Sequence, residues 1–144
     1  MIHSLMLMAM FLPMASHTPL DLSQVQNDDH LIVGFESVGC YHGERYQFRF
    51  QFTDHGADVE VVQWSTETGD WRFLHKRSLT KNALGRIQNT LVYYRKSRTG
   101  GCTTEERLTF ALYKKGKRLL SESYRDQSCR SYEDATLFRW IELI

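Results

Sequence analysis

The sequence predicts an α+β domain in which about six strands form an antiparallel sheet, with one or two helices packed on one face, in the order β-β-β-β-α-β-β-α. Three observations predict this fold. Aromatic and polar residues alternate from Tyr46 to Phe52, short turn sequences separate the segments around it, and apolar residues recur at helical spacing from Leu84 to Tyr94. With 144 residues, the chain has the size of one ordinary domain.

The first four strands are expected to form a meander. In the clearest of them, Tyr46 to Phe52, four aromatic side chains share one face and form a wall of the core. Turn residues at Asp54-His55-Gly56 and at Glu67 to Asp70 separate it from the strands that follow. The other three strands are predicted at Leu31 to Ser37, Val59 to Trp64 and Trp71 to His75. Strands joined by such short turns run antiparallel.

The second half of the chain is predicted to begin with a helix of about four turns. Its start is marked by a cap at Ser78 or Thr80, and its end by Gly100-Gly101. Its apolar face contains Leu84, Ile87, Leu91 and Tyr94. A hairpin around Lys115-Gly116 follows, with strands at Glu106 to Tyr113 and Arg118 to Arg125. A capping box at Ser131 to Asp134 then precedes apolar residues at helical spacing and predicts a C-terminal helix.

The first sixteen residues have the layout of a secretory signal peptide. An apolar run from Leu5 to Met14 is followed by the small residues Ala15 and Ser16, but no Lys or Arg precedes it. The run is too short for a transmembrane segment, so an interfacial segment or a buried N-terminal helix are the alternatives. We therefore expect a periplasmic or secreted protein with a signal peptide at 1–16, an N-terminal arm at 17–30 and a single domain at 31–144.

Two of the three cysteines are candidates for a disulfide. If the hairpin closes symmetrically over Lys115-Gly116, Cys102 lies opposite Cys129 at its open end. The same face would then carry Leu108, Phe110, Leu112 and Leu119. Opposed residues have Cα atoms about 4.5–5.5 Å apart, which a disulfide accepts. We expect this bridge in an exported chain, and two buried free thiols if the chain is not exported.

Cys40 remains without a partner by count. It lies between the first two predicted strands, close to His42 and Glu44. One hypothesis is a reactive thiolate with His42 as base and Glu44 as the orienting group, which would make the protein a cysteine-dependent enzyme. The alternative is a small buried side chain at a strand end, which is much the commoner situation for a cysteine. The balance favours a protein that is not an enzyme.

Charge is distributed unevenly along the chain, although the formal net charge is only +1. Asp21 to Asp70 contains ten acidic and two basic residues, whereas Trp71 to Arg130 contains fifteen basic and four acidic ones. The basic residues gather at the predicted helix end and hairpin tip, namely Arg95, Lys96, Arg98, Lys114, Lys115, Lys117 and Arg118. Nearby tyrosines make this a candidate polyanion-binding surface. Dipole complementarity at the helix end and protection of a sheet edge would explain the same cations.

Other chemistries lack a motif in this sequence. The six histidines include no HExxH pattern and no His-x-His pair, and no CxxC pair is present, so we expect no metal site. Neither a glycine-rich phosphate loop nor a Gly-x-Ser-x-Gly elbow occurs, and no cofactor is expected.

The sequence therefore favours a small exported binding protein, of the inhibitor, immunity or recognition type, that acts on a protein partner. An anionic surface is the alternative partner, and nucleic acid is not expected for an exported chain. Loops on a rigid sheet commonly carry function, so the candidate contact surface comprises two loop regions. Its residues are Tyr41, His42, Glu44, Arg45, Lys114, Lys115, Lys117 and Arg118.

Overall fold

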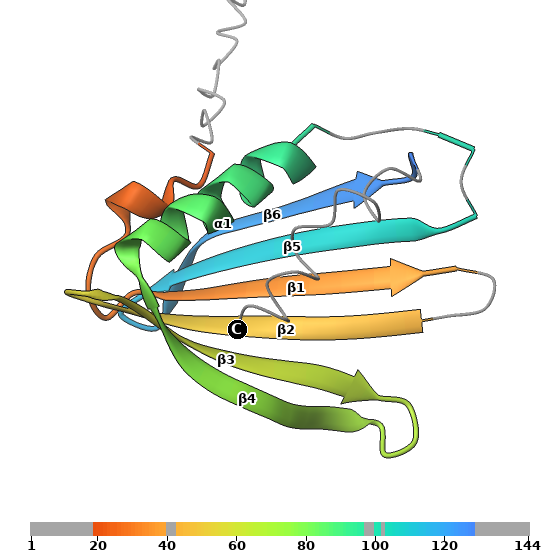
Figure 1. Cartoon of the computed structure of the whole chain (residues 1–144), viewed down its shortest axis with the longest axis horizontal. Coiled ribbons are helices and arrows are strands. Elements are labelled where there is room, and N and C mark those ends of the chain that lie inside the picture. The colour runs from red at the N-terminus through yellow and green to blue at the C-terminus, as the bar shows by residue number, and fades with distance from the viewer. Residues whose placement is uncertain (1–18, 40–42, 97–99, 102, 129–144) are drawn as a thin grey trace, which may run out of the picture.

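A single six-stranded antiparallel sheet dominates the computed structural model, which describes residues 19–39, 43–96, 100–101 and 103–128. The strands are β1 (His30–Val38), β2 (Gly43–Thr53), β3 (Gly56–Ser65), β4 (Asp70–Thr80), β5 (Glu105–Lys114) and β6 (Lys117–Asp126). Helix α1 (Lys81–Tyr94) packs against the sheet, and a 3-10 turn, η1 (Leu22–Gln24), precedes β1. Figure 1 shows α1 lying across one face of the sheet. The predicted α+β class is confirmed.

The strand order is β4-β3-β2-β1-β5-β6. The first four strands form the expected meander, and the β5–β6 hairpin joins the sheet beside β1. Leu31 consequently has Phe50 of β2 on one side and Leu112 of β5 on the other. Strand β1 therefore lies in the middle of the sheet, while β4 and β6 form its edges.

Helix α1 begins where the sequence predicted. Thr80 is the N-cap, and its side-chain oxygen accepts a hydrogen bond from the Ala83 amide at 3.3 Å. Ser78, the other candidate cap, belongs instead to β4, which runs directly into the helix. The predicted apolar face is buried, with Leu84, Ile87, Leu91 and Tyr94 in the core. The predicted C-terminal helix lies outside the described residues.

The core fills the space between α1 and the sheet face turned toward it, which we call the inner face. The aromatic wall predicted on β2 is present, because Tyr46, Phe48, Phe50 and Phe52 are all buried. Each fully buried side chain of this size contributes roughly 1.5–3 kcal/mol relative to exposure. Register places buried apolar residues of three other strands on the same face, namely Leu31, Val33 and Phe35 of β1, Val59 and Val61 of β3, and Leu108 and Phe110 of β5.

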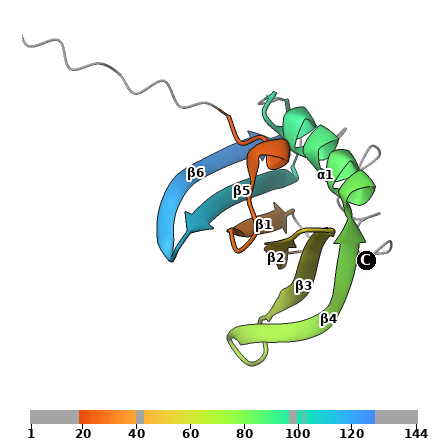
Figure 2. The same ribbon diagram turned by 90° about the vertical axis from the view of Figure 1, so that its left-hand side faces the viewer.

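Part of the segment expected to form an arm packs against the helix. Leu20 and Leu22 are buried in the core cluster. The Gln88 side chain of α1 accepts a hydrogen bond from the Leu22 amide at 2.9 Å and donates one to the Leu20 carbonyl at 3.4 Å. Figure 2 shows η1 beside α1, on the same side of the sheet. This packing could not be predicted from the sequence, because two leucines among polar residues show no periodicity.

The β5–β6 hairpin differs from the symmetric register. Tyr113 pairs with Arg118, but Leu112 pairs with Leu120, so Leu119 is the extra residue of a β-bulge. The prediction that Leu119 shares the core face is wrong, because its side chain is 60% exposed. The bulge shifts the described pairs from Leu112–Leu120 to Glu106–Asp126 by one residue, so the symmetric register on which the Cys102–Cys129 prediction rested does not hold along these strands. Both cysteines lie outside the described residues.

Candidate functional site

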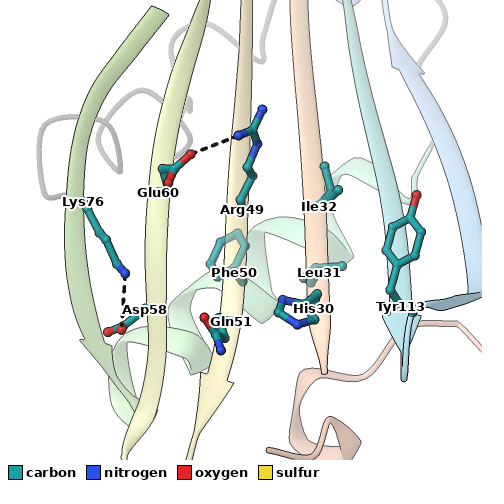
Figure 3. A pocket seen from close by; sticks show the side chains of 11 residues that line it. His30, Leu31, Ile32, Arg49, Phe50, Gln51, Asp58, Glu60, Lys76 and Tyr113 are labelled. Atoms are coloured by element: carbon teal, nitrogen blue, oxygen red, sulfur yellow. Dashed lines mark hydrogen bonds and ion pairs between the residues drawn. The ribbon is translucent and has the colours of Figure 1, made fainter. Parts of the chain in front are cut away.

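The candidate site lies on the sheet face turned away from α1, which we call the outer face. Side chains alternate between the two faces along each strand, so the burial of Leu31 and Val33 turns His30 and Ile32 outward. The same alternation turns Arg49 and Gln51 of β2 outward, where both are exposed. Figure 3 shows these side chains on the near side of the sheet, with α1 behind it. The outer face is therefore formed by alternate residues of several strands.

Small side chains occupy the middle of the outer face. Gly34 of β1 pairs with Thr109 of β5, which in turn pairs with Ser123 of β6. A Cβ atom built on Gly34 would lie 2.5 Å from the Thr109 hydroxyl oxygen, so that hydroxyl occupies the space a side chain would need. In the neighbouring row, Ala111 pairs with Ser121. A glycine inside a strand often marks close approach of another group. Here the missing side chain of Gly34 leaves the centre of the outer face lower than its surroundings.

A hollow of about 380 Å³ lies at the end of the outer face where β1 begins. Ile32 and Tyr113 provide its apolar lining, and His30 and the turn residue Gly116 also contribute. On the far side, its charged side chains form two ion pairs, Arg49 with Glu60 at 3.0 Å and Lys76 with Asp58 at 3.8 Å. Figure 3 shows both pairs on the β2, β3 and β4 side of the hollow.

A second, smaller hollow of about 190 Å³ lies at the opposite end of the same face. Its lining includes Gly34 and Trp71, and the Trp71 ring meets the Trp64 ring edge to face at a centroid distance of 5.5 Å. The Glu36 carboxylate lies between two guanidinium groups, 2.6 Å from Arg45 and 3.7 Å from Arg107. Aromatic rings and paired charges therefore surround the low centre of the face.

These ion pairs contribute little to folding, because exposed pairs are worth about 0–1 kcal/mol in solvent. Their effect on the site is electrostatic balance, since they neutralise most of the charge on the outer face. The β5–β6 turn is different. Within the described part of the chain, Lys115, Lys117 and Arg118 form no ion pair. The strongest uncompensated positive charge at this end of the sheet therefore lies beside the larger hollow.

The structure separates the two predicted contact loops. Gly43 pairs with Val38 at one end of β1, whereas Tyr113 pairs with His30 at the other. Eight residues of strand place these ends about 27 Å apart. Of the first loop, Arg45 lies on the outer face beside Glu36. Glu44 hydrogen-bonds the phenol of Tyr46 on the inner side. Burial is the main cause that raises the pKa of this phenol, and the Glu44 carboxylate raises it further. Tyr41 and His42 lie outside the described residues.

The second predicted loop lies beside the larger hollow. Lys115 and Gly116 both have positive φ angles, 49° and 75°, which makes a tight two-residue turn between β5 and β6. Lys114 donates a hydrogen bond to the Gln26 side chain at 2.7 Å, and Lys117 and Arg118 start β6. Cys40 and His42, on which the enzyme hypothesis rests, lie outside the described residues, so the structure does not test that hypothesis.

The helix end and the hairpin tip do not form one basic surface. Arg95 is largely buried, lies 3.8 Å from the Glu122 carboxylate and hydrogen-bonds the Leu20 carbonyl. Glu122 is five residues along β6 from Lys117, a separation of about 17 Å. The Arg95 charge therefore stabilises the packing of residues 19–24 on α1 and is not displayed with the hairpin lysines. Arg98 lies outside the described residues.

A buried polar cluster lies on the inner face, away from both hollows. The Tyr94 hydroxyl donates a hydrogen bond to Glu106 at 3.0 Å, and Glu106 is 1% exposed. The neighbouring β6 residue Asp126 is also buried and accepts hydrogen bonds from the amide and hydroxyl of Ser128. Burial, followed by the Glu106 carboxylate, raises the pKa of the Tyr94 phenol. This cluster fastens the end of α1 to the sheet.

Within the described ranges, no group of three or more His, Cys, Asp or Glu side chains could hold a metal ion. None of the helices formed by those residues is long and apolar enough to cross a membrane. Comparison of the chain with protein-family models, curated proteins and solved structures found no match.

Sequence reasoning found the basic hairpin tip but missed the outer face. The missed residues include Ile32, Gly34, Arg49 and Trp71, which come from three different strands. Polar and small residues alternating with the core positions were the available signal. That signal identifies a surface only once the pairing register is known, because the register decides which outward-facing residues of neighbouring strands lie side by side.

Proposed function

We propose that this chain is a small exported binding protein, of the inhibitor, immunity or recognition type, which docks the outer face of its sheet on a protein partner. The observation that carries the proposal is the exposed, hollowed outer face, which combines aromatic rings with arginines. Trp71 and Tyr113 line its two hollows, and Phe73 is 57% exposed on the same face. Aromatic residues and arginine are enriched where protein interfaces bind most strongly.

The size of the face supports this proposal. Five inter-strand spacings give a width of about 25 Å and eight residues of strand give a length of about 27 Å, hence an area of about 700 Å². A standard protein complex buries about 800 Å² on each partner. The outer face alone is therefore large enough for a specific complex.

The sheet edges favour docking on the face over addition of a strand. In β4, Val61 pairs with His75 and Val62 with Phe73, so Leu74 is the extra residue of a bulge. The bulge at Leu119 interrupts β6 in the same way. Bulges twist an edge away from incoming strands, and charged side chains on edge strands such as β4 and β6 add to this protection. The outer face has no comparable obstruction at Gly34.

The apolar run from Leu5 to Met14 supports an extracytoplasmic site of action, because it has the layout of a signal peptide. The partner would then be an extracytoplasmic or extracellular protein.

Affinity capture tests the proposal, with the mature chain immobilised and extracytoplasmic fractions applied. Wild type should retain a stoichiometric partner, and Trp71→Ala and Phe73→Ala should each reduce its retention. Val92→Ala is the matched control, because Val92 is an exposed apolar residue of α1, on the other side of the sheet. Equal retention by wild type and both outer-face variants would refute docking on this face. Circular dichroism would establish that each variant is folded.

A further inference from the structure

The turn between β5 and β6 places a concentrated positive charge against an apolar hollow. Four of the five residues from Lys114 to Arg118 are basic, and the fifth, Gly116, lines the hollow itself. No Asp or Glu occurs in the sequence between Arg107 and Ser121. The positive φ angles of Lys115 and Gly116 define a tight turn, so the backbone that carries these cations lies at one place on the rim.

The hollow differs in chemistry from the turn. Ile32 and the Tyr113 ring give it an apolar lining, and its volume of about 380 Å³ falls within the range of ligand sites. Its carboxylates, Asp58 and Glu60, are engaged by Lys76 and Arg49. An apolar group can therefore enter the hollow without meeting an unpaired charge, while an anionic group finds its partners on the neighbouring turn.

We propose that the hollow and the basic turn together bind an extended acidic segment of a protein. One apolar or aromatic side chain of that segment fills the hollow between Ile32 and Tyr113. Its carboxylates lie against Lys115 of the turn and Arg118, which pairs with Tyr113, and neither cation forms an ion pair within the described residues. This inference rests on the proposed function, because it assigns the chemistry of the segment that docks on the outer face.

Charge complementarity and the apolar lining jointly favour an acidic peptide over a sulfated glycan. Clustered cations attract any polyanion and give steep salt dependence. A glycan, however, offers no apolar side chain for the hollow. An acidic peptide with an apolar residue supplies both kinds of group, and it suits a site whose apolar and cationic parts are adjacent.

A defined peptide tests the inference by fluorescence anisotropy. The probe is a labelled extended peptide with glutamates flanking one phenylalanine, and the matched probe has alanine in place of the phenylalanine. Wild type should bind the phenylalanine peptide more tightly than the alanine peptide, and added salt should weaken both. The double variant Lys115→Glu/Arg118→Glu should weaken binding on the order of tenfold, because two attractions become repulsions.

The charge control is Lys81→Glu/Arg86→Glu, which makes the same charge change on exposed residues of α1. It should retain the wild-type affinity within about twofold. For the hollow, Tyr113→Ala and Ile32→Ala should each remove the preference for phenylalanine over alanine. Two separate variants keep this test valid if one of them is unstable.

Two peptide-binding results would overturn the inference, and one capture result would do so as well. One is equal binding of the peptide by the turn variant and the α1 control. The other is equal affinity for both peptides, accompanied by heparin or phosphatidylglycerol vesicle binding that depends on the turn, which would make the turn a general polyanion site. Retention of a captured partner by the turn variant, together with its loss from Trp71→Ala, would refute the acidic segment while leaving docking on the outer face intact.

Discussion

The hydrogen bond from Tyr94 to Glu106 is expected to stabilise the fold in a pH-dependent way. Both residues are buried, and their oxygens are 3.0 Å apart. Replacing Tyr94 by phenylalanine keeps the ring but removes the donor from a buried carboxylate. Leaving a buried acceptor without its donor costs about 1–3 kcal/mol, so Tyr94→Phe should lower the free energy of unfolding by this amount at neutral pH.

The difference between wild type and Tyr94→Phe should shrink in alkali. Burial and the Glu106 carboxylate raise the pKa of Tyr94 in the folded state, while a tyrosine in the unfolded chain titrates near pH 10. The stabilisation is therefore complete below about pH 10 and falls above it, because only the unfolded chain loses the proton. At about pH 11 the difference should be smaller by about 1.4 kcal/mol.

Urea denaturation of both proteins, from neutral pH to about pH 11, measures these differences. Tyr113→Phe is the control, since Tyr113 lies on the outer face and its change should stay within about 0.5 kcal/mol. Equal stability of wild type and Tyr94→Phe at neutral pH would show that the bond contributes nothing. A difference that stays constant through pH 11 would refute the argument from the raised pKa.

Two further predictions concern the turns and the hairpin register, and both are measured by denaturant unfolding. Gly56→Ala should lower the free energy of unfolding by about 2–4 kcal/mol, because φ is 151° and the new Cβ would lie 1.8 Å from the Leu79 carbonyl oxygen. Gly69→Ala, which has open space around it, should lower the free energy of unfolding by only about 1–2 kcal/mol. Leu108→Ala should lower the free energy of unfolding by about 2–5 kcal/mol, whereas Leu119→Ala should change it by no more than about 0.5 kcal/mol. Similar costs for the two leucines would contradict the bulged register.

Local patterns predicted the elements of this fold well. The alternation from Tyr46 to Phe52 identified β2 and its buried face, and the spacing from Leu84 to Tyr94 identified α1. Its N-cap, Thr80, was one of two candidates. These signals lie within one element, where side-chain direction follows directly from residue spacing. The element order could therefore be predicted before any tertiary contact was known.

The relations between distant elements were harder to predict. Nothing local to β1 or β5 indicates that Leu31 pairs with Leu112, because both strands offer the same kind of apolar face. The extra residue at Leu119 precedes another leucine, so the hydrophobic pattern fits either register. The outer face depends on both of these relations, which explains why the basic turn was found without the hollow beside it.

The central place of β1 also affects how the protein folds. Its pairing with β2 closes a short loop, whereas its pairing with β5 brings together residues such as Val38 and Glu105, or His30 and Tyr113, from distant parts of the sequence. Such long-range pairing is slow compared with local hairpin formation. Until the β5–β6 hairpin docks, β1 is itself a temporary edge with an unpaired backbone and apolar residues on one face. That interval is when the chain is most exposed to aggregation or to capture by a chaperone.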